Sequence, residues 1–234
     1  MTLSLDIADR LAVEFAGLPA GTRVAGEHEI MRRFEVGRSA ARSALQELER
    51  RLIVRRARGS GTYVNRRIDY VLSRDRRPSW HETVTAAGAR PRSVVRDIAV
   101  RPLPTDRAAL LDLQPGTPAH LLRRLSYIDD LLASCSREWV PVATLPNLGD
   151  ALHAVESLDA VLRQVAGLDP WRSWSRVSHE VPPPDVLADL EMAAPEPLSL
   201  VESVSRDRGS GAPVMCSSGW MRPDMVRVVV ELGE

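Results

Sequence analysis

Two arginines, Arg38 and Arg42, stand four residues apart and have the type and spacing to read DNA. Residues four apart share one face of a helix, and Ser39 lies beside them. Guanidinium groups form bidentate hydrogen bonds with guanine O6 and N7 in the major groove. The apolar residues of the same segment, such as Leu45 and Leu48, fall on the opposite face. The spacing predicts a recognition helix, and the alternative is a solvated helix face.

The basic residues of the chain gather around this segment. Residues 32–67 hold 11 Arg and 3 Glu, whereas residues 71–234 hold 18 Arg and 22 acidic residues. The whole chain has a formal net charge of zero, and all of its Lys+Arg residues are Arg. A GC-rich genome accounts for the preference for Arg, but not for the clustering. A clustered basic stretch is typical of a surface that binds a polyanion.

The elements around the arginine pair follow the order of a winged helix-turn-helix. Apolar spacing predicts three helices and two strands, at Asp6–Phe15, from about Glu27, at Arg38–Arg51, at Ile53–Arg56 and at Thr62–Val64. Between the strands, Arg58 and Gly59 lie in a glycine-rich turn. There the backbone can approach a phosphate or enter the minor groove, so this turn is the predicted wing tip.

Four segments of this first domain resemble the GntR family of regulators. They are Leu18–Val24, Glu27–Glu29, Val36–Leu45 and Arg58–Val64. The resemblance implies that Arg38, Ser39 and Arg42 contact bases and phosphates and that Arg58 and Gly59 form the wing tip. It also implies that His28 stands where many members place an arginine that contacts DNA. Gly37 departs from the family, which usually caps the recognition helix with Ser or Thr, but glycine is a tolerable N-cap.

The chain is expected to have two domains. Residues 1–67 form the DNA-binding domain, the polar and Arg-rich residues 68–79 form a linker, and residues 80–234 form a second domain. The second domain contains an internal repeat, because Asp106–Ile128 and Asp185–Asp207 align at a constant offset. Each half reads as helix, strand, turn and strand. Two such halves predict an α+β domain with a mostly antiparallel sheet and a ligand cavity between the halves.

This second domain resembles the UTRA effector domain of the HutC branch of GntR regulators, an α/β fold shared with chorismate-lyase-like proteins. The resemblance rests on Ala87–Pro91, on the helix and turn of Leu110–Pro118 and on Arg222–Asp224. The segment Gly167–Arg176 looks most like the phosphonate-metabolism regulators of that branch. Effectors of such domains are usually small polar molecules, and this one is expected to be anionic.

The resemblance also implies an effector site. Arg124 would bind an anionic group, Ser126 and Ser157 would add hydroxyl hydrogen bonds, and Glu138 would accept from an amine or hydroxyl. Arg172 and Arg176 are further candidates for the anion, because a guanidinium suits phosphate or carboxylate. The alternative for Arg124 is a buried ion pair with Glu138 as its partner, and the alternative for the other two is a solvated strand edge.

Tryptophan supplies nearly all the aromatic mass of this domain. Four of the five tryptophans, Trp80, Trp171, Trp174 and Trp220, are expected near the cavity. Trp80 and Trp220 are candidates for direct contact with the effector. Core packing is the usual alternative for tryptophan in a sheet domain.

These features predict a cytoplasmic, homodimeric repressor that binds a double-stranded operator with inverted-repeat half-sites about one helical turn apart. No cofactor, metal or membrane is expected: Cys135 and Cys216 are isolated, the histidines are scattered, and no apolar run approaches ~18 residues. One alternative is a chorismate-lyase-like enzyme, although no catalytic triad or paired carboxylates stand out. The other is a second domain that only dimerises.

Overall fold

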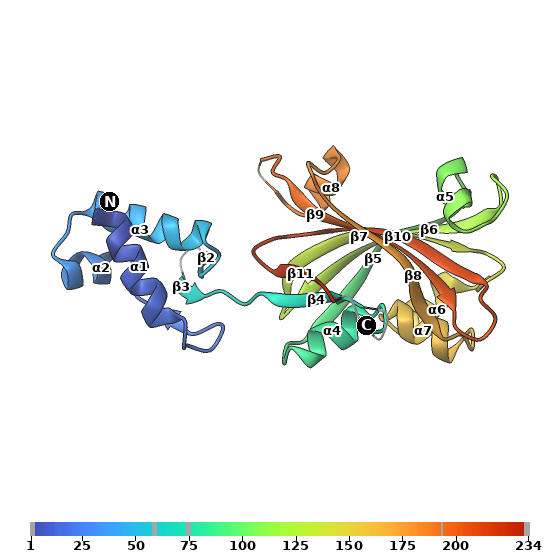
Figure 1. The fold of residues 1–234 in the computed structure, drawn as a ribbon, viewed down its shortest axis with the longest axis horizontal. Coiled ribbons are helices and arrows are strands. Elements are labelled where there is room, and N and C mark those ends of the chain that lie inside the picture. The colour runs from blue at the N-terminus through green and yellow to red at the C-terminus, as the bar shows by residue number, and fades with distance from the viewer. Residues whose placement is uncertain (1–2, 58–59, 74–75, 193, 232–234) are drawn as a thin grey trace. The chain divides into compact units, whose positions relative to one another are not determined.

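The computed structural model describes residues 3–57, 60–73, 76–192 and 194–231, and the chain divides into two compact units (Figure 1). The first unit covers residues 1–67 and the second covers residues 68–234. Each unit has a hydrophobic core of its own, as two independently folding domains would.

The first unit is a winged helix-turn-helix. Its elements are α1 (Leu3–Phe15), β1 (Arg23–Val24), α2 (Glu27–Phe34), α3 (Arg38–Arg50), β2 (Val54–Ala57) and β3 (Gly61–Val64). The strands form an antiparallel sheet in the order β1-β3-β2. The three helices and the hairpin confirm the order predicted from the sequence. The two-residue strand β1 was not predicted, because a segment this short has no periodicity.

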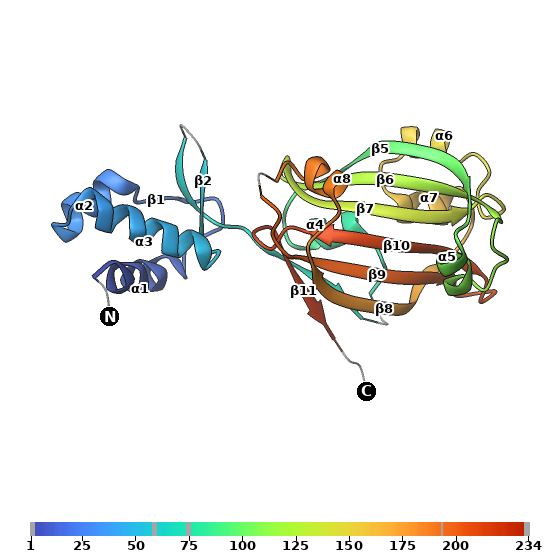
Figure 2. The same cartoon turned by 90° about the horizontal axis from the view of Figure 1, so that it is seen from above.

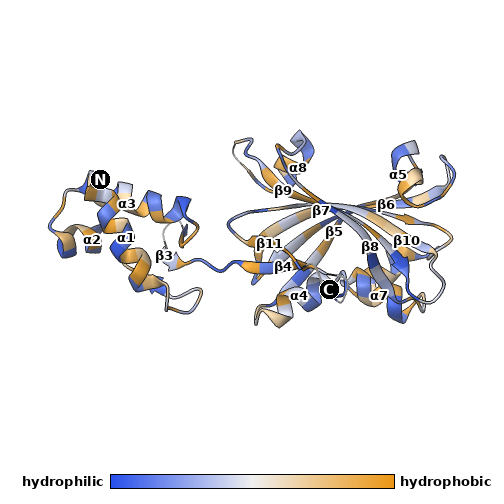
Figure 3. Ribbon diagram, viewed as in Figure 1, coloured by the Kyte–Doolittle hydropathy of each residue, from blue (hydrophilic) through white to orange (hydrophobic). Residues whose placement is uncertain are grey.

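Amphipathic spacing explains the packing of these helices. The helix α1 buries Ile7, Leu11 and Phe15, and α3 buries Leu45 and Leu48, at intervals of three or four residues. Apolar and polar residues both occur along these helices (Figure 3). The apolar side of each is used in the shared core, so the polar side of α3 is left for solvent or DNA.

The second unit is built on a six-stranded antiparallel sheet. Its elements are β4 (Ile68–Leu72), α4 (Trp80–Ala86), β5 (Pro91–Pro102), α5 (Thr105–Leu110), β6 (Pro118–Ile128), β7 (Leu131–Pro141), α6 (Leu148–Ala154), α7 (Leu158–Gln164), β8 (Pro170–Glu180), α8 (Pro184–Asp189), β9 (Leu198–Asp207), β10 (Pro213–Met221) and β11 (Val226–Val230). The strand order is β5-β6-β7-β10-β9-β8. The halves α5-β6-β7 and α8-β9-β10 meet where β7 pairs with β10, which confirms the predicted repeat and fold class.

Helices lie on both faces of this sheet. The helices α4, α6 and α7 cover one face, here called the front, and α5 and α8 lie at opposite ends of the back face (Figures 1 and 2). On the front, Leu122, Val140 and Val214 pack with α6 and α7. On the back, Cys135 and Trp220 pack with α8. Successive side chains of a strand point to opposite faces of the sheet, so neighbouring residues along each strand pack against different helices.

Residues 68–79 were expected to form a linker, and this expectation is wrong for residues 68–72. Residues 68–72 form β4, which pairs in parallel with β11 from Val226 opposite Ile68 to Val230 opposite Leu72. Ile68, Val71 and Leu72 are buried, because this short apolar run packs in the second unit despite the arginines that flank it. Residues 65–67, a hydrophilic segment, are all that separate β3 from β4 (Figure 3).

Candidate functional site

The outer face of α3 presents the predicted DNA-reading residues. Arg38, Ser39 and Arg42 are exposed, and the Arg38 side chain has 71% of its surface accessible. Gly37 caps the helix in extended conformation without a side-chain hydrogen bond. The N–H groups of the first turn thus have no capping side chain in front of them, and helix N-termini bind phosphate well.

His28 on α2 is exposed and joins this face through Glu27. Arg38 Nε donates to Glu27 Oε1 at 2.5 Å. This hydrogen bond holds the pKa of Glu27 below its usual value, and the charges of Arg42 and His28 act in the same direction. Three of the residues predicted to contact DNA, Arg38, Arg42 and His28, therefore surround the Glu27 carboxylate. The hydrogen bond between Glu27 and Arg38 links α2 to the start of α3.

The predicted wing-tip residues, Arg58 and Gly59, lie outside the described residues. The strands that lead to them are described. Tyr63 on β3 donates from its hydroxyl to the Ser60 carbonyl oxygen at 3.0 Å, and the Arg55 guanidinium lies 5.3 Å from the Tyr63 ring centroid. Arg55 is thus held beside the hairpin, where it can supply a phosphate contact.

The second unit contains a pocket on the front face of its sheet. Side chains from β4, α4, α7 and five strands of the large sheet contribute to it. Its lining comprises Tyr70, Pro78, Trp80, His81, Arg124, Ser126, Ser134, Ser136, Glu138, Ser157, Leu158, Asp159, Leu162, Pro170, Arg172, Val201, Ser203, Ser205, Met215, Ser217, Gly219 and Met221. Six of the eight predicted effector residues are in this set, and the pocket spans both halves of the repeat.

An ion pair between Arg124 and Glu138 lies in the pocket wall. Arg124 donates from Nε (3.2 Å) and Nη2 (2.7 Å) to Glu138 Oε1, and Ser136 Oγ donates to the same oxygen at 2.7 Å. Both residues are more than 90% buried. Arg124 thus fits both interpretations in part. It lines the pocket, as an effector-binding residue would, and its charge is already balanced by Glu138, as in a buried ion pair. Glu138 Oε2 has no hydrogen-bond partner among the described residues.

Arg172 is the second buried guanidinium of the pocket. Its Nη2 donates to the Tyr70 hydroxyl at 2.6 Å, and its guanidinium lies 5.1 Å from the Tyr70 ring centroid. Its Nη1 is buried and has no hydrogen-bond partner among the described residues. Arg172 therefore keeps an unpaired donor in the pocket wall, and it also contacts β4, the strand that follows the first unit.

Asp159 at the start of α7 supplies a second carboxylate. Its Oδ2 accepts from Arg163 Nε at 3.0 Å, and its buried Oδ1 has no hydrogen-bond partner in the described part of the chain. Burial raises the pKa of Asp159, and the charge and hydrogen bond of Arg163 offset this only in part. The folded protein thus favours the protonated carboxyl more than the unfolded chain does.

A pH dependence of stability follows from Asp159. Because its folded pKa is raised, its stabilising contribution is present below the unfolded pKa and is lost as pH rises through the folded pKa. Asp159→Asn removes this loss. We expect the melting temperature of the variant, relative to the wild type, to be higher at pH 7 than at about pH 4. Calorimetry beside Asp150→Asn, at an exposed position of α6, tests this, and a difference independent of pH would contradict it.

The remaining front-face candidates have defined roles. Ser157 accepts from the Ala160 N–H at 3.3 Å and caps α7, and Ser126 Oγ lies 3.4 Å from Ser93 Oγ. Trp80 Nε1 donates to the Tyr127 carbonyl oxygen at 3.3 Å. These contacts fix the side chains in place, as a preformed ligand site requires.

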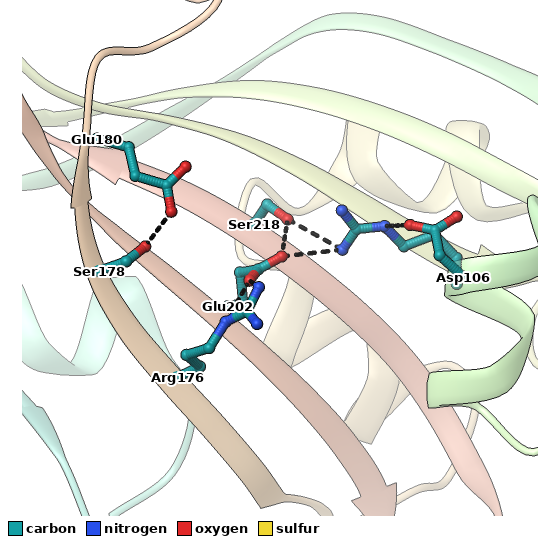
Figure 4. Close-up of polar contacts among 7 residues, drawn as sticks. Asp106, Arg176, Ser178, Glu180, Glu202 and Ser218 are labelled. Carbon is teal, nitrogen blue, oxygen red and sulfur yellow. Dashed lines mark hydrogen bonds and ion pairs between the residues drawn. The ribbon is translucent and has the colours of Figure 1, made fainter.

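Arg176 does not line the pocket, contrary to the expectation. It lies on the back face, where its guanidinium Nε donates to Glu202 Oε2 at 3.0 Å. Glu202 also accepts from Ser218 and Arg107 (Figure 4). The cause is a register shift between Arg172 and Trp174, which leaves Ser173 without a paired residue in β9. Arg172 and Arg176 are four apart and would share a face in a regular strand, but the bulge places them on opposite faces.

Trp220 is also on the back face, where it packs with α8 and lies under the Arg137 guanidinium at 5.3 Å. The structure describes all five tryptophans, and of these Trp80 lines the pocket. Trp171 and Trp174 lie beside Arg208 and Arg176 instead. Of the four tryptophans expected near the cavity, Trp80 therefore lines it and the other three do not, and core or surface packing accounts for their contacts.

Several pocket residues were not predicted. They are Tyr70, His81, Asp159 and five serines, Ser134, Ser136, Ser203, Ser205 and Ser217. Along β7 and β9 the serines alternate with apolar or bulky residues, a period of two that marks one polar sheet face, and Ser217 of β10 lies on the same face. Such a face under helices indicates a pocket. Burial lowers the pKa of His81, with the Arg124 charge adding to the effect, so the ring favours its neutral form.

The described residues contain no group of three or more His, Cys, Asp or Glu side chains suited to a metal ion. Cys135 and Cys216 are buried free thiols, as expected, and burial raises the pKa of Cys135 to about 12. Within the described ranges, no helix is long and apolar enough to cross a membrane.

Comparison with known proteins identifies both units. Residues 6–64 match the gntR family of bacterial regulatory proteins, and residues 86–227 match the UTRA domain. The chain is 26% identical over 226 residues to the HTH-type transcriptional regulator GgaR of Escherichia coli K12, covering 94% of this chain and 86% of GgaR. It is 27% identical over 213 residues to PhnF of the same strain, a probable transcriptional regulator, covering 90% and 87%.

Solved structures share the fold. PhnF from Mycobacterium smegmatis matches with a TM-score of 0.64 and 22% identity, covering 97% of this chain and 99% of that chain. The possible transcriptional regulator YydK from Bacillus subtilis subsp. subtilis str. 168 matches with a TM-score of 0.57 and 19% identity over the full length of both chains. With a UTRA match over more than half of its length and a GntR match before it, the chain belongs to the GntR family of bacterial regulatory proteins and carries a UTRA domain.

Proposed function

We propose that this regulator is a homodimeric repressor of the HutC branch. It acts in the cytoplasm, and a small polar, anionic metabolite in the front-face pocket controls its affinity for the operator. The observation that carries the proposal is the place of Tyr70. This residue lies in β4, which starts four residues after β3 ends, and it accepts a hydrogen bond from Arg172 in the pocket.

In the DNA-binding half, Arg38 and Arg42 read bases, and Ser39 and His28 contact the backbone. The exposure of these residues and their arrangement around Glu27 support this assignment. Arg58 and Gly59 are proposed to form the wing contact. A dimer would set two α3 helices on an inverted repeat, with half-sites about one helical turn apart.

In the effector half, an anionic group binds Arg172 Nη1, which is buried without a partner among the described residues. A negative group at Nη1 draws the guanidinium toward itself and so alters the hydrogen bond that Nη2 of the same group donates to the Tyr70 hydroxyl. Occupancy of the pocket thereby changes how firmly β4 is bound to the rest of the second unit. Through the three residues 65–67, this change reaches β3 and shifts the operator-binding equilibrium.

Tyr70→Phe tests this coupling. The variant keeps its ring but loses the hydroxyl that accepts from Arg172. We expect operator affinity without effector to stay within about threefold of the wild type, whereas effector-induced release falls from about 5–150-fold to about twofold or less. Fluorescence anisotropy of labelled operator DNA measures both.

Tyr127→Phe is the matched control, because Tyr127 lies on β6 outside the pocket lining, with its ring under Arg92. It should respond to effector as the wild type does. Full effector response in Tyr70→Phe would sink the proposed route through β4.

Operator recognition is tested by anisotropy titration of the protein against DNA from upstream of its own gene, with shuffled DNA of the same composition as reference. Tight binding to the upstream DNA that one metabolite weakens supports the proposal. Specific binding that no metabolite alters favours a second domain that only dimerises. Equal binding to both DNAs contradicts the proposed operator.

A further inference from the structure

Arg38, on the outer face of α3, is held by one residue of the neighbouring helix. Its Nε donates to Oε1 of Glu27, the first residue of α2, at 2.5 Å. Within the described ranges, the guanidinium makes no hydrogen bond or ion pair with any other residue. Because a guanidinium is planar, a partner on Nε limits the directions in which its two amino groups can point. Both amino groups of Arg38 therefore stay available on a side chain whose position is already restricted.

Those two amino groups can supply the donors that a guanine accepts. Bidentate recognition of guanine O6 and N7 takes two N–H donors from one guanidinium. Glu27 occupies neither amino group, since it accepts from Nε. A side chain that is restricted before binding also loses less conformational entropy when it meets the base. The Glu27 contact is therefore compatible with base reading by Arg38 and favours it.

The exposure of the two side chains fits this arrangement. Arg38 has 71% of its side-chain surface exposed, whereas Glu27 has 21%. The guanidinium is thus largely open to DNA, and the carboxylate that holds it is mostly covered by the protein. An ion pair with so exposed a partner contributes little to folding stability. Its main consequence is the direction in which Arg38 points.

Arg42, on the same face of α3, lacks such a support. It is exposed, and it makes no hydrogen bond or ion pair among the residues that the structure describes. Its charge acts on Glu27 without a hydrogen bond between them. The carboxylate therefore holds one of the two arginines, and its removal should affect recognition by Arg38 more than recognition by Arg42.

The charge of Glu27 has a separate effect. The hydrogen bond from Arg38 lowers the pKa of Glu27, so the carboxylate stays ionised at neutral pH. A negative charge on a surface that faces DNA repels the phosphates of every sequence alike. Glu27 is therefore expected to lower the affinity for all DNA through its charge. Any gain in discrimination between sequences must come from its contact with Arg38.

From these observations we propose that Glu27 is a positioning residue of operator recognition, which acts by aiming the two amino groups of Arg38 at a guanine. The inference rests on the proposed function in that Arg38 reads a base. Its signature is a pair of opposite changes. Removal of Glu27 strengthens binding to unrelated DNA and weakens discrimination, whereas loss of a merely structural contact would weaken binding to all DNA.

Anisotropy titration of the full chain, at one salt concentration and without effector, tests this role. The two probes are DNA from upstream of its own gene and shuffled DNA of the same composition. We expect Glu27→Ala to bind shuffled DNA about two- to fivefold more tightly and to lower the ratio of operator affinity to shuffled affinity by about tenfold. The amide oxygen of Glu27→Gln can still accept from Arg38 Nε. This variant should bind shuffled DNA as tightly as Glu27→Ala but keep the ratio within about threefold of the wild type.

Glu29→Ala is the matched control. Glu29 is an exposed acid in the same first turn of α2, and it accepts no hydrogen bond from an arginine among the described residues. Its removal should leave the affinity ratio within about twofold of the wild type. In the Arg38→Ala background, Glu27→Ala should also change the ratio by about twofold or less, because the residue that it positions is absent. In the Arg42→Ala background it should keep its full effect.

An unchanged ratio in Glu27→Ala would overturn the positioning role, as would an equal loss of the ratio in the Arg38→Ala background. If Arg38→Ala lowers the ratio and Glu27→Ala does not, the positioning role fails but base reading by Arg38 stands. If Arg38→Ala itself leaves the ratio unchanged, base reading by Arg38 fails and the positioning role fails with it.

Discussion

Replacing both Arg38 and Arg42 by alanine is expected to abolish specific operator binding. Both side chains project from the exposed face of α3, and neither contributes to the core formed by Leu45 and Leu48. Loss of one bidentate contact with a base costs about 1–3 kcal/mol, or about 5–150-fold in affinity, and the two losses add if the contacts are independent. Anisotropy titration at fixed salt measures the loss.

The single variants separate base reading from phosphate binding. A base-contacting arginine changes discrimination between operator and mutated operator, whereas a phosphate-contacting arginine weakens all sequences and lowers the salt slope by about one. Arg50→Ala is the control on the same helix, since Arg50 pairs with Glu47 at the far end of α3. We expect a change of about twofold or less from Arg50→Ala, and equal losses in Arg50→Ala and Arg38→Ala would contradict the role of Arg38.

Replacing Arg124 by methionine is expected to destabilise the second unit by about 3–5 kcal/mol, because it leaves Glu138 buried without its cation. For a domain of this size, that corresponds to a fall of roughly 6–20 °C in melting temperature. Scanning calorimetry measures it.

The double variant Arg124→Met with Glu138→Leu should recover most of the loss, because replacing both members of a buried ion pair by apolar groups is often neutral. Arg227→Met removes an exposed ion pair with Asp69 and should cost at most about 1 kcal/mol. Equal losses in Arg124→Met and Arg227→Met would show that the Arg124 ion pair has no special importance for stability.

The sequence predicted the first unit well because its signals are local. Periodic apolar residues define α1 and α3, and the turn at Gly37 separates α3 from α2. The repeat at a constant offset predicted both halves of the large sheet for the same reason. The pairing of β4 with β11 was missed, because it joins Ile68 to Val226 across the length of the domain and no local pattern reveals it.

The effector site was predicted in part. Arg124, Glu138 and Arg172 do line one pocket, but Arg176 and Trp220 face away from it. One unpaired residue, Ser173, reverses the face of every later residue in β8. Spacing alone does not reveal such a bulge, because it depends on how β8 pairs with β9.

The central claim is that the pocket and the operator are coupled. The direct measurement is operator affinity at one salt concentration with and without a saturating compound that calorimetry shows to bind the pocket. We predict a change of about 5–150-fold, corresponding to about 1–3 kcal/mol of coupling, which Arg172→Gln removes without loss of operator binding. Unchanged operator affinity with the pocket demonstrably occupied would contradict ligand control of this regulator.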